Sequence, residues 1–350
     1  MTKRVSLADV ANSLGLSKTV VSLVVNDKAD AHGISKKTQK RVMEKIKELN
    51  YQPNVLARGF RTGKTQTIGL IVSDISNRFY SRIARHIEDL AWQHGYGVVI
   101  CSTDEKTEKE RKQIRLLLDR RVDGLIISSS QDEAAFFNEL KESGIPHVLI
   151  DRVFDQMQSS SVSVDNYGGA RMATRHLLAQ GVRDIALMVI SPTHISTIRQ
   201  RINGFLSAMQ DAGNAVPEER ILSVPFDTME AAVKEYLQYF FQSGTMPQAI
   251  FTLNNNLTSL CIKYLRKLSI SIPHEVMLIG FDDTEYFEYT QPTISVIEQP
   301  LEKISGEAFR VLLNQISLKQ KASAENILLP VDIIIRESSV SGNSSFTPIH

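Results

Sequence analysis

The stretch LSKTVVSLVVND, residues 16–27, decides how the start of this chain folds. Its centre is almost wholly apolar, so it could form either a buried strand or a helix with one buried side. A half-buried strand requires strict alternation of apolar and polar residues, which the stretch lacks. In a helix, one face would consist of Val21, Val24 and Val25. The opposite face would then carry Thr19, Ser22, Leu23 and Asn26, and the spacing therefore predicts a helix.

Two further helices are expected on either side of this segment. The first follows Ser6, which forms the pattern of a capping box with Asp9. Its apolar residues recur at helical spacing, Gly15 ends it, and Ser17 is the expected N-cap of the helix described above. A third helix, in SKKTQKRVMEKIKELNY, places an apolar stripe among lysines. Three short helices with a glycine-containing turn predict a helix-turn-helix domain.

The second helix of such a domain faces outward and fits the major groove of DNA. Lys18, on the flank of that helix, joins Thr19, Ser22, Leu23 and Asn26 as residues able to touch phosphates and base edges. Residues 1–64 contain 13 Lys or Arg against 5 Asp or Glu, whereas the remainder contains 27 against 34. A basic head on an acidic body favours a polyanionic partner for the head. A solvated charged face on a purely structural three-helix unit is the alternative.

From Ile68 onward, apolar strand-like runs alternate with amphipathic segments of helical length, for example 78–94 and 106–120. The predicted buried parallel strands are IGLIV, GVVIC, GLIIS, PHVLID, DIALMVI, QAIFTL and VMLIGFD. Such alternation predicts doubly wound α/β sheets, and about 270 residues suffice for two lobes. Ligands of these folds bind where the strands end.

Composition and motifs exclude several classes of protein. An apolar content of 42% and a charged content of 23% are typical of globular chains, and no apolar run approaches the roughly 18 residues of a membrane span. The chain has no recognisable secretory signal, and its two cysteines, Cys101 and Cys261, favour a reducing compartment. It contains no nucleophile elbow, phosphate-binding loop or metal-spaced cluster. We therefore expect no enzyme activity, no metal and no cofactor.

Several motifs resemble those of the LacI/GalR family of bacterial transcription repressors. They are VSLADVANSLGLSKTVVSLVVN, LNYQPNVLAR and the later IGFDD, in the family's order and spacing, and the resemblance covers roughly residues 4–337. It implies a helix-turn-helix domain at 1–52, a hinge at 53–65, and a body at 66–338 similar to type I periplasmic sugar-binding proteins. The two lobes would be segmental, with crossovers near 160, 290 and 325. A disordered tail is expected at 339–350.

The resemblance also implies additional DNA contacts. These would come from Ser6, Ser17, Asn50, Tyr51, Asn54, Ala57, Arg58 and Phe60. Residues 53–61 match a hinge that folds on operator DNA, and Phe60 takes the position of an apolar side chain that wedges into the minor groove. Gly59 would weaken that helix. Leu23 stands where many relatives carry a polar base-reading residue, so it would contact a thymine methyl group instead.

Effector-binding candidates come first from the ends of predicted strands. Asp74, Asn77 and Phe79 follow the first strand, Asp151 and Arg152 end the fourth, and Asp282 ends the strand in IGFDD. Phe79 could stack on a sugar ring or a base, or it could be ordinary packing. Asp283 is expected to tie down its own loop. Gln299 lies near a lobe crossover and is a further candidate.

Other effector candidates match family positions. Arg199 and Arg201 in STIRQRINGF match residues that bond sugar hydroxyls or a carboxylate, and one of the two could be a surface arginine instead. Asn254 and Asn255 match an Asn–Asp pair of the family. Asn255 removes a charge there, so the effector is expected to differ from a common neutral hexose.

Together these features predict a DNA-binding transcriptional regulator, a repressor by resemblance, controlled allosterically by a small molecule. The effector would be a carbohydrate or, alternatively, a nucleobase. Its other partners would be double-stranded operator DNA and a second copy of the chain, because the polar tail lacks the heptads of a tetramerising extension. The protein is expected in the bacterial cytoplasm, on the nucleoid when DNA-bound, with no membrane partner. A sugar-binding transport protein without DNA function is the rival interpretation.

Overall fold

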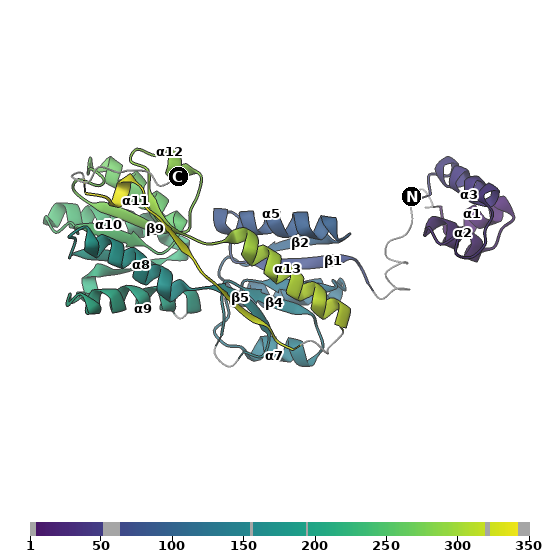
Figure 1. The fold of residues 1–350 in the computed structure, drawn as a ribbon, viewed down its shortest axis with the longest axis horizontal. Helices are drawn as coiled ribbons and strands as arrows, with labels where there is room; N and C mark the ends of the chain where they lie inside the picture. Colours follow the sequence, from purple (N-terminus) through teal and green to yellow (C-terminus); the bar gives the residue numbers. More distant parts are fainter. Residues whose placement is uncertain (1–4, 52–63, 155–156, 194, 319–322, 342–350) are drawn as a thin grey trace. The chain divides into compact units, whose positions relative to one another are not determined.

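The computed structural model describes residues 5–51, 64–154, 157–193, 195–318 and 323–341. The chain divides into two compact units, Met1–Thr65 and Gln66–His350 (Figure 1). Most of the predicted hinge at 53–65 lies outside the described residues.

The N-terminal unit consists of the three predicted helices: α1 (Leu7–Leu14), α2 (Lys18–Val25) and α3 (Lys36–Glu48). Ser6 and Asp9 form the predicted capping box, and Ser17 caps α2 by accepting a hydrogen bond from the Val20 amide. Gly15 ends α1 with a φ of 65°, a left-handed conformation that favours glycine. The local sequence signals of this unit are therefore confirmed.

The apolar face of α2 builds the core of the N-terminal unit. Val21 is fully buried and Val24 nearly so, and both pack with Val10, Ala11 and Val42 from the other two helices. Helices α1 and α2 meet at 113°, within the range of helix-turn-helix pairs. No single described helix is long and apolar enough to cross a membrane, although this bent pair reaches that apolarity when its two helices are counted together.

The body contains two six-stranded sheets, one per lobe, which Figure 1 shows side by side. The first sheet has the order β11-β5-β4-β3-β1-β2, and all its neighbouring strands are parallel. Its strands are β1 (Thr67–Val72), β2 (Gly97–Ser102), β3 (Gly124–Ile127), β4 (His147–Ile150), β5 (Ser160–Val164) and β11 (Asn326–Leu329).

The second sheet has the order β12-β10-β9-β8-β6-β7, and β12 is its one antiparallel strand. Its strands are β6 (Ile185–Ser191), β7 (Ile221–Pro225), β8 (Ala249–Thr252), β9 (Met277–Phe281), β10 (Ser295–Glu298) and β12 (Asp332–Ile334). All seven predicted strands are present, and the doubly wound α/β prediction is confirmed.

Helices cover both faces of each sheet. In the first lobe, α5 (Arg78–Gln93) and α13 (Leu301–Leu318) share one core, and α6 (Thr107–Asp119) and α7 (Ala135–Glu142) pack on the other face. In the second lobe the corresponding helices are α8 (Asn166–Ala179) and α9 (Ser196–Asp211) on one face and α10 (Met229–Ser243) and α11 (Asn255–Lys267) on the other. The short α12 (Tyr286–Tyr289) follows β9.

The lobes are segmental. The chain leaves the first lobe after β5, returns between β10 and α13, and leaves again between β11 and β12 (Figure 1). These crossovers lie somewhat C-terminal to the predicted positions near 160, 290 and 325.

The predicted disordered tail begins too early in the sequence. Ser339 is fully buried, where its hydroxyl donates a 2.6 Å hydrogen bond to Ser295, and Ser341 bonds to Gln180. Residues 339–341 are therefore part of the second lobe, and the rest of the predicted tail lies outside the described residues.

Strand β2 also differs from its prediction as a buried strand. It is an edge strand with a single neighbour, β1, and Ile100 on it is 42% exposed. The apolar run GVVIC predicts a strand, but it does not indicate whether that strand lies at the centre or at the edge of the sheet. An unpaired apolar edge requires some cover, and it is considered again below.

Gly204 allows α8 and α9 to pack closely. A Cβ atom at this position would lie 2.3 Å from the carbonyl oxygen of Tyr167 in α8, which is backbone and cannot rotate away. We expect Gly204→Ala to lower the free energy of unfolding of the body by about 1–3 kcal/mol. Urea denaturation followed by circular dichroism measures this change.

Gly306 in α13 provides the matched control, because nothing lies within 4 Å of a Cβ atom built there. Gly306→Ala should leave stability unchanged or raise it by up to about 1 kcal/mol, since alanine is the better helix former. Equal midpoints for Gly204→Ala and the unsubstituted protein would show that α8 and α9 do not need this close approach.

Candidate functional sites

The outward face of α2 is the candidate DNA-reading surface. Ser17, Lys18 and Thr19 at its N-terminal end are exposed, and Ser22 and Leu23 further along are half-buried. Helix α2 ends at Val25. The predicted contact residue Asn26 is therefore its C-cap, and its amide donates a 2.6 Å hydrogen bond to the Ser22 carbonyl oxygen. The exposed polar groups of this surface are concentrated at the start of the helix.

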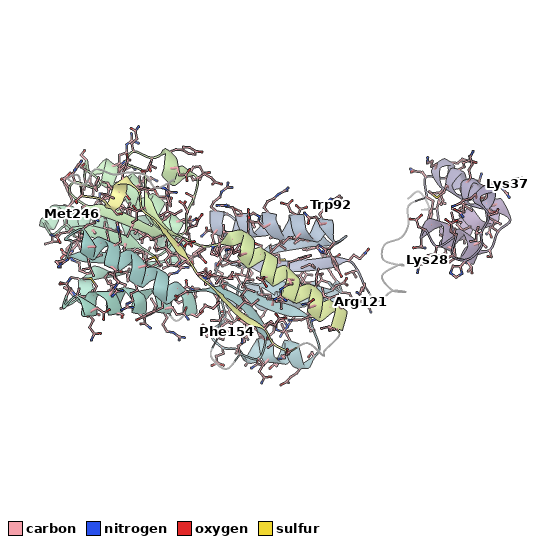
Figure 2. All side chains as sticks on the ribbon, viewed as in Figure 1. Lys28, Lys37, Trp92, Arg121, Phe154 and Met246 are labelled. Atoms are coloured by element: carbon pink, nitrogen blue, oxygen red, sulfur yellow. The ribbon has the colours of Figure 1, made fainter. Side chains whose placement is uncertain are left out.

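The other predicted DNA contacts are distributed differently. Ser6 is exposed and serves as the N-cap of α1, Asn50 is exposed with a φ of 47°, and Tyr51 is half-buried against the core of the unit. Asn54, Ala57, Arg58 and Phe60 lie outside the described residues. Lysines also project from this unit, among them Lys28 and Lys37 (Figure 2). The unit therefore combines an exposed helix N-terminus with surrounding positive charge, which suits phosphate contacts.

The second candidate site is a cavity between the lobes of the body. Side chains from the carboxyl ends of strands in both sheets line it. Three of its acidic residues directly or closely follow a strand: Glu105 after β2, Asp151 after β4 and Asp282 after β9. All three have left-handed backbones, with φ of 57°, 66° and 74° respectively. Non-glycine residues with positive φ are uncommon, and such strain is concentrated at ligand sites.

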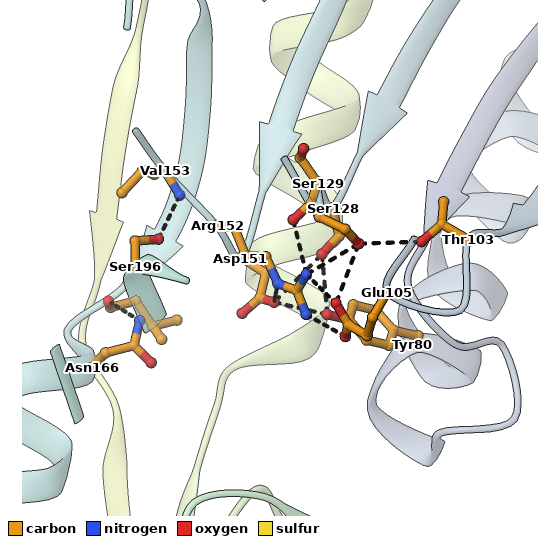
Figure 3. Close-up of polar contacts among 12 residues, drawn as sticks. Tyr80, Thr103, Glu105, Ser128, Ser129, Asp151, Arg152, Val153, Asn166 and Ser196 are labelled. Atoms are coloured by element: carbon orange, nitrogen blue, oxygen red, sulfur yellow. Dashed lines mark hydrogen bonds and ion pairs between the residues drawn. The ribbon is translucent and has the colours of Figure 1, made fainter. Parts of the chain in front are cut away.

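A buried ion pair occupies the first-lobe side of this cavity, as Figure 3 shows. Arg152 donates two hydrogen bonds to the Glu105 carboxylate, from Nη1 to Oε2 at 2.7 Å and from Nη2 to Oε1 at 2.6 Å. Its Nη1 also donates to the Ser129 carbonyl oxygen. The neighbouring Asp151 carboxylate accepts a 2.9 Å hydrogen bond from the Tyr80 hydroxyl. These contacts fix Arg152, whose residue exposure is only 6%.

The pKa shifts follow from this pairing. Burial alone would raise the pKa of Glu105, but the Arg152 guanidinium outweighs it and holds that pKa below its ordinary value. Burial is the largest single influence on Arg152 and lowers its pKa, but Glu105, Tyr80 and Asp151 together raise that pKa, so the net shift is upward. Burial raises the pKa of the Tyr80 hydroxyl, which therefore stays protonated as a donor. At neutral pH the pair is ionised on both sides.

Arg201 occupies the second-lobe side of the cavity. Its Nε donates to Asn166 Oδ1 at 2.7 Å and its Nη1 to the Leu253 carbonyl oxygen at 2.6 Å. The guanidinium lies 3.5 Å from the ring centre of Phe281 and 4.0 Å from Asp282. Burial lowers the pKa of Arg201, although Asp282 opposes this shift. Arg201 is thus fixed by its own lobe.

Asp282 and Gln299 form the acceptor side of the cavity. Gln299 donates its amide hydrogen to Asp282 Oδ1, and burial raises the pKa of Asp282. No described donor reaches Gln299 Oε1, although the residue is only 4% exposed. Arg152 Nε is likewise without a hydrogen-bond acceptor among the described residues. Unmet buried polar groups of this kind are expected where a ligand supplies the missing partners.

Two aromatic rings contribute apolar surface to the cavity. Phe79, from the first turn of α5, is 5% exposed and packs edge-on against Tyr80, while Phe226 comes from the second lobe. Phe79 therefore packs in the core, as one interpretation predicted, and it also lines the cavity, while its stacking on a ligand ring stays a prediction.

Nine of the eleven predicted effector residues line this cavity. They are Asp74, Asn77, Phe79, Asp151, Arg152, Arg201, Asn254, Asp282 and Gln299. Arg199 does not; it is exposed and lines a neighbouring pocket with Ser196. On a helix, residues two positions apart point in different directions, so only one of the two arginines can face the cleft. Asp283 pairs with Arg336, which confirms its predicted loop-fixing role.

Asn255 is the other predicted residue that does not line the cavity. It is 2% exposed, and its amide donates a 3.0 Å hydrogen bond to Asn77 Oδ1 in the opposite lobe. The loss of charge at this position therefore affects a contact between the lobes.

Two further contacts join the lobes around the cavity. Arg78 at the start of α5 pairs with Glu285 in the second lobe, at 2.8 Å and 3.1 Å, and the Val153 amide donates to the Ser196 hydroxyl at 3.0 Å. Arg78 lowers the pKa of Glu285 to about 2, so the pair stays ionised at neutral pH. These contacts hold the two lobes together.

Several residues that line the cavity were not predicted from the sequence, among them Tyr80, Glu105 and Phe226. Glu105 follows GVVIC at the same kind of strand end that identified Asp74 and Asp151, so the same rule would have found it. Phe226 follows β7, a strand that no strong apolar run marked, and no sequence signal identified it.

A unit with an outward-facing recognition helix, joined to a two-lobed body with a polar ligand cavity, defines a DNA-binding protein that responds to a small molecule. Comparisons with known proteins agree. Residues 6–54 match the family described as bacterial regulatory proteins, lacI family. Residues 174–339 match a periplasmic binding protein-like domain. The HTH-type transcriptional regulator DegA of Bacillus subtilis (strain 168) is 32% identical over 96% of this chain and 98% of its own length.

The chain therefore belongs to the lacI family, and it is a DNA-binding transcriptional regulator under the control of a small-molecule effector. Two solved structures support this assignment. The lac repressor dimer bound to operator and the anti-inducer ONPF matches with a TM-score of 0.83 and 25% identity, covering 97% of this chain and all of that one. A regulator from Alkaliphilus metalliredigens QYMF, complexed with D-xylulofuranose, matches at 0.69 and 30% identity, covering 79% and 100%.

The ion pair between Arg78 and Glu285 can be tested by charge reversal. Arg78→Glu or Glu285→Arg alone would place like charges together and favour lobe opening, whereas the double exchange would restore the pair. Although an exposed pair of this kind contributes only about 0.2–1 kcal/mol, that is enough to change the proportions of two states of similar energy. Fluorescence energy transfer between dyes on the two lobes measures the opening. Identical transfer in all four proteins would show that this pair does not influence the lobe angle.

Proposed function

We propose that the N-terminal unit binds a specific double-stranded operator and that a sugar or sugar derivative in the cavity changes the affinity of this binding. The observation that carries the effector part is the convergence of strand-end polar groups from both lobes on one cavity with unmet buried hydrogen-bonding atoms. An operator partner places the protein in the bacterial cytoplasm. The cavity would bind its ligand without chemical conversion, as expected of a regulator.

For the DNA contacts, we propose that Ser17, Lys18 and Thr19 contact phosphates and that Ser22 and Leu23 approach base edges. Their order along α2 supports this division, because the exposed polar residues lie at the helix start and the half-buried pair lies further along. A helix N-terminus also attracts phosphate. Ser6, Asn26, Asn50 and Tyr51 would support this surface, and Asn54, Ala57, Arg58 and Phe60 would contact the minor groove.

We further propose that the protein acts as a homodimer, with one N-terminal unit on each half of a roughly palindromic operator. The open edge of β2 supports a partner surface on the first lobe. Ile100 on this strand is 42% exposed, and Leu116 and Trp92 on the flanking helices are 48% and 79% exposed. Trp92 is labelled in Figure 2. The lac repressor structure that this chain resembles is a dimer on operator DNA.

Fluorescence anisotropy on DNA from immediately upstream of the coding sequence tests the proposed function. Titrations across a salt series, with and without a panel of sugars and purines, should show tight, salt-sensitive binding that one compound alters. Equally weak binding to every duplex would contradict the operator proposal. An effect of a purine but of no sugar would replace the proposed effector class.

Lys18 offers a direct test of the DNA surface. We expect Lys18→Ala to weaken binding to operator and random duplexes by similar factors and to reduce the slope of log affinity against log salt by about one, because one phosphate contact is lost. Lys234 is an exposed lysine on α10 of the body, and Lys234→Ala is the matched control. It should change neither the affinity for DNA nor the salt slope. If the slope of log affinity against log salt were the same in Lys18→Ala as in the unsubstituted protein, Lys18 would not contact a phosphate.

Asp282 tests the effector side. Asp282→Asn should weaken effector binding about ten- to hundredfold, because a charged acceptor of ligand hydroxyls is replaced by a neutral one. Operator affinity without effector should stay close to that of the unsubstituted protein. Asp119→Asn, at the exposed end of α6, is the control. Calorimetric titration measures the affinities for effector and for operator. An unchanged effector affinity in Asp282→Asn would show that the effector does not contact Asp282.

A further inference from the structure

The cavity between the lobes contains more negative than positive charge. Four carboxylates line it, those of Asp74, Glu105, Asp151 and Asp282, against the two guanidinium groups of Arg152 and Arg201. Both guanidinium groups are buried and already paired within the protein. We infer that the effector is an uncharged polyhydroxylated molecule, and that Glu105 is the residue that excludes its anionic analogues. This inference rests on the proposed function of the cavity.

Glu105 accepts the hydrogen bonds that the two terminal nitrogens of Arg152 would otherwise donate to an anionic ligand. An arginine recognises a carboxylate or phosphate by donating two parallel hydrogen bonds from its planar fork. Here both terminal nitrogens of Arg152 donate to the two oxygens of Glu105, and Nη1 donates in addition to the Ser129 carbonyl oxygen. Among the three guanidinium nitrogens, only Nε lacks a hydrogen-bond acceptor among the described residues, and it lies 3.7 Å from Asp151 Oδ2. An anionic ligand would have to displace a protein carboxylate to reach this fork.

Arg201 is likewise engaged within the protein. Its Nε and Nη1 donate to Asn166 and to the Leu253 carbonyl oxygen, and one face of its guanidinium lies over the Phe281 ring. The Asp282 carboxylate, 4.0 Å away, offsets the remaining charge. A ligand can receive a hydrogen bond from this arginine, whose positive charge is partly offset by Asp282.

The groups left open in the cavity favour a ligand that donates hydrogen bonds. Gln299 Oε1 is buried and accepts from no described donor, because the amide end of the side chain is turned toward Asp282. Asp282 and Asp151 offer further acceptor oxygens. Hydroxyl groups donate to such acceptors and also accept from Arg152 Nε, whereas a carboxylate or phosphate dianion has no hydrogen to donate. Like charges at short range in a buried cavity would add repulsion.

Matched sugar series test this inference on the full-length protein. Titration calorimetry would compare D-glucose with D-glucuronate and D-glucose 6-phosphate, D-galactose with D-galacturonate and D-galactose 6-phosphate, and D-ribose with D-ribose 5-phosphate. We expect the uncharged member of at least one series to bind, and its anionic members to bind at least tenfold more weakly. Anionic members that bind as tightly as the uncharged sugar would overturn the inference while leaving the cavity as the effector site. No binding in any series would overturn both.

Glu105→Gln tests the role of this residue, because it keeps the shape of the side chain and frees the Arg152 fork of its counter-charge. The variant should gain at least tenfold in affinity for the anionic members relative to the uncharged one. Glu235→Gln, the same change on the exposed surface of α10, should leave the ratio unchanged. An unchanged ratio in folded Glu105→Gln would show that another group excludes anions. If this variant fails to fold, the series on the unsubstituted protein still decides the charge class.

Discussion

The direction of the strands is the constraint on which the ligand site depends. In both lobes of the body, the parallel strands end at the sheet edge that faces the other lobe, so residues that follow different strands meet in one cavity. Asp74, Asp151 and Asp282 come from three strands in two sheets and line the same space. The left-handed backbone at Asp151 and Asp282 shows that the chain turns sharply as it leaves each strand. Two lobes of this kind require no additional loops to build a polar site.

The buried pair of Arg152 and Glu105 is better explained by function than by stability. Removing two charges from water costs several kcal/mol each, and the attraction between them often only offsets that cost. The fork geometry and the Ser129 carbonyl oxygen keep the pair satisfied. A well-packed apolar pair could stabilise the lobe equally well, but it would not set the charge of the cavity. The pair therefore belongs to the ligand chemistry of the cleft.

Much of the fold could be predicted because it depends on local patterns. The i, i+3 spacing of Val21 and Val24 identified the buried face of α2, and the long apolar runs identified the central strands. Strands β5 and β10 escaped prediction because SSVSV and SVIE are short and partly polar. The edge position of β2 depends on which strands pair, and that is a property of the whole sheet.

The candidate site could be predicted to the extent that it depends on strand ends. That rule located Asp74, Asp151 and Asp282, and applied once more it would have located Glu105. It could not show that Asn255 turns toward Asn77 in the other lobe, because the orientation of a side chain at a helix start depends on its neighbours in space. For the same reason, sequence alone could not decide between Arg199 and Arg201.

We propose that the cavity and the DNA-binding unit are energetically coupled. Coupling between two binding sites is reciprocal, so the effector and the operator must change each other's affinity by the same factor. The most direct measurement is a pair of titrations, operator with and without saturating effector, and effector with free and operator-saturated protein. We expect the same affinity ratio in both titrations, on the order of 5- to 150-fold. A ratio of one in both titrations would contradict this proposal.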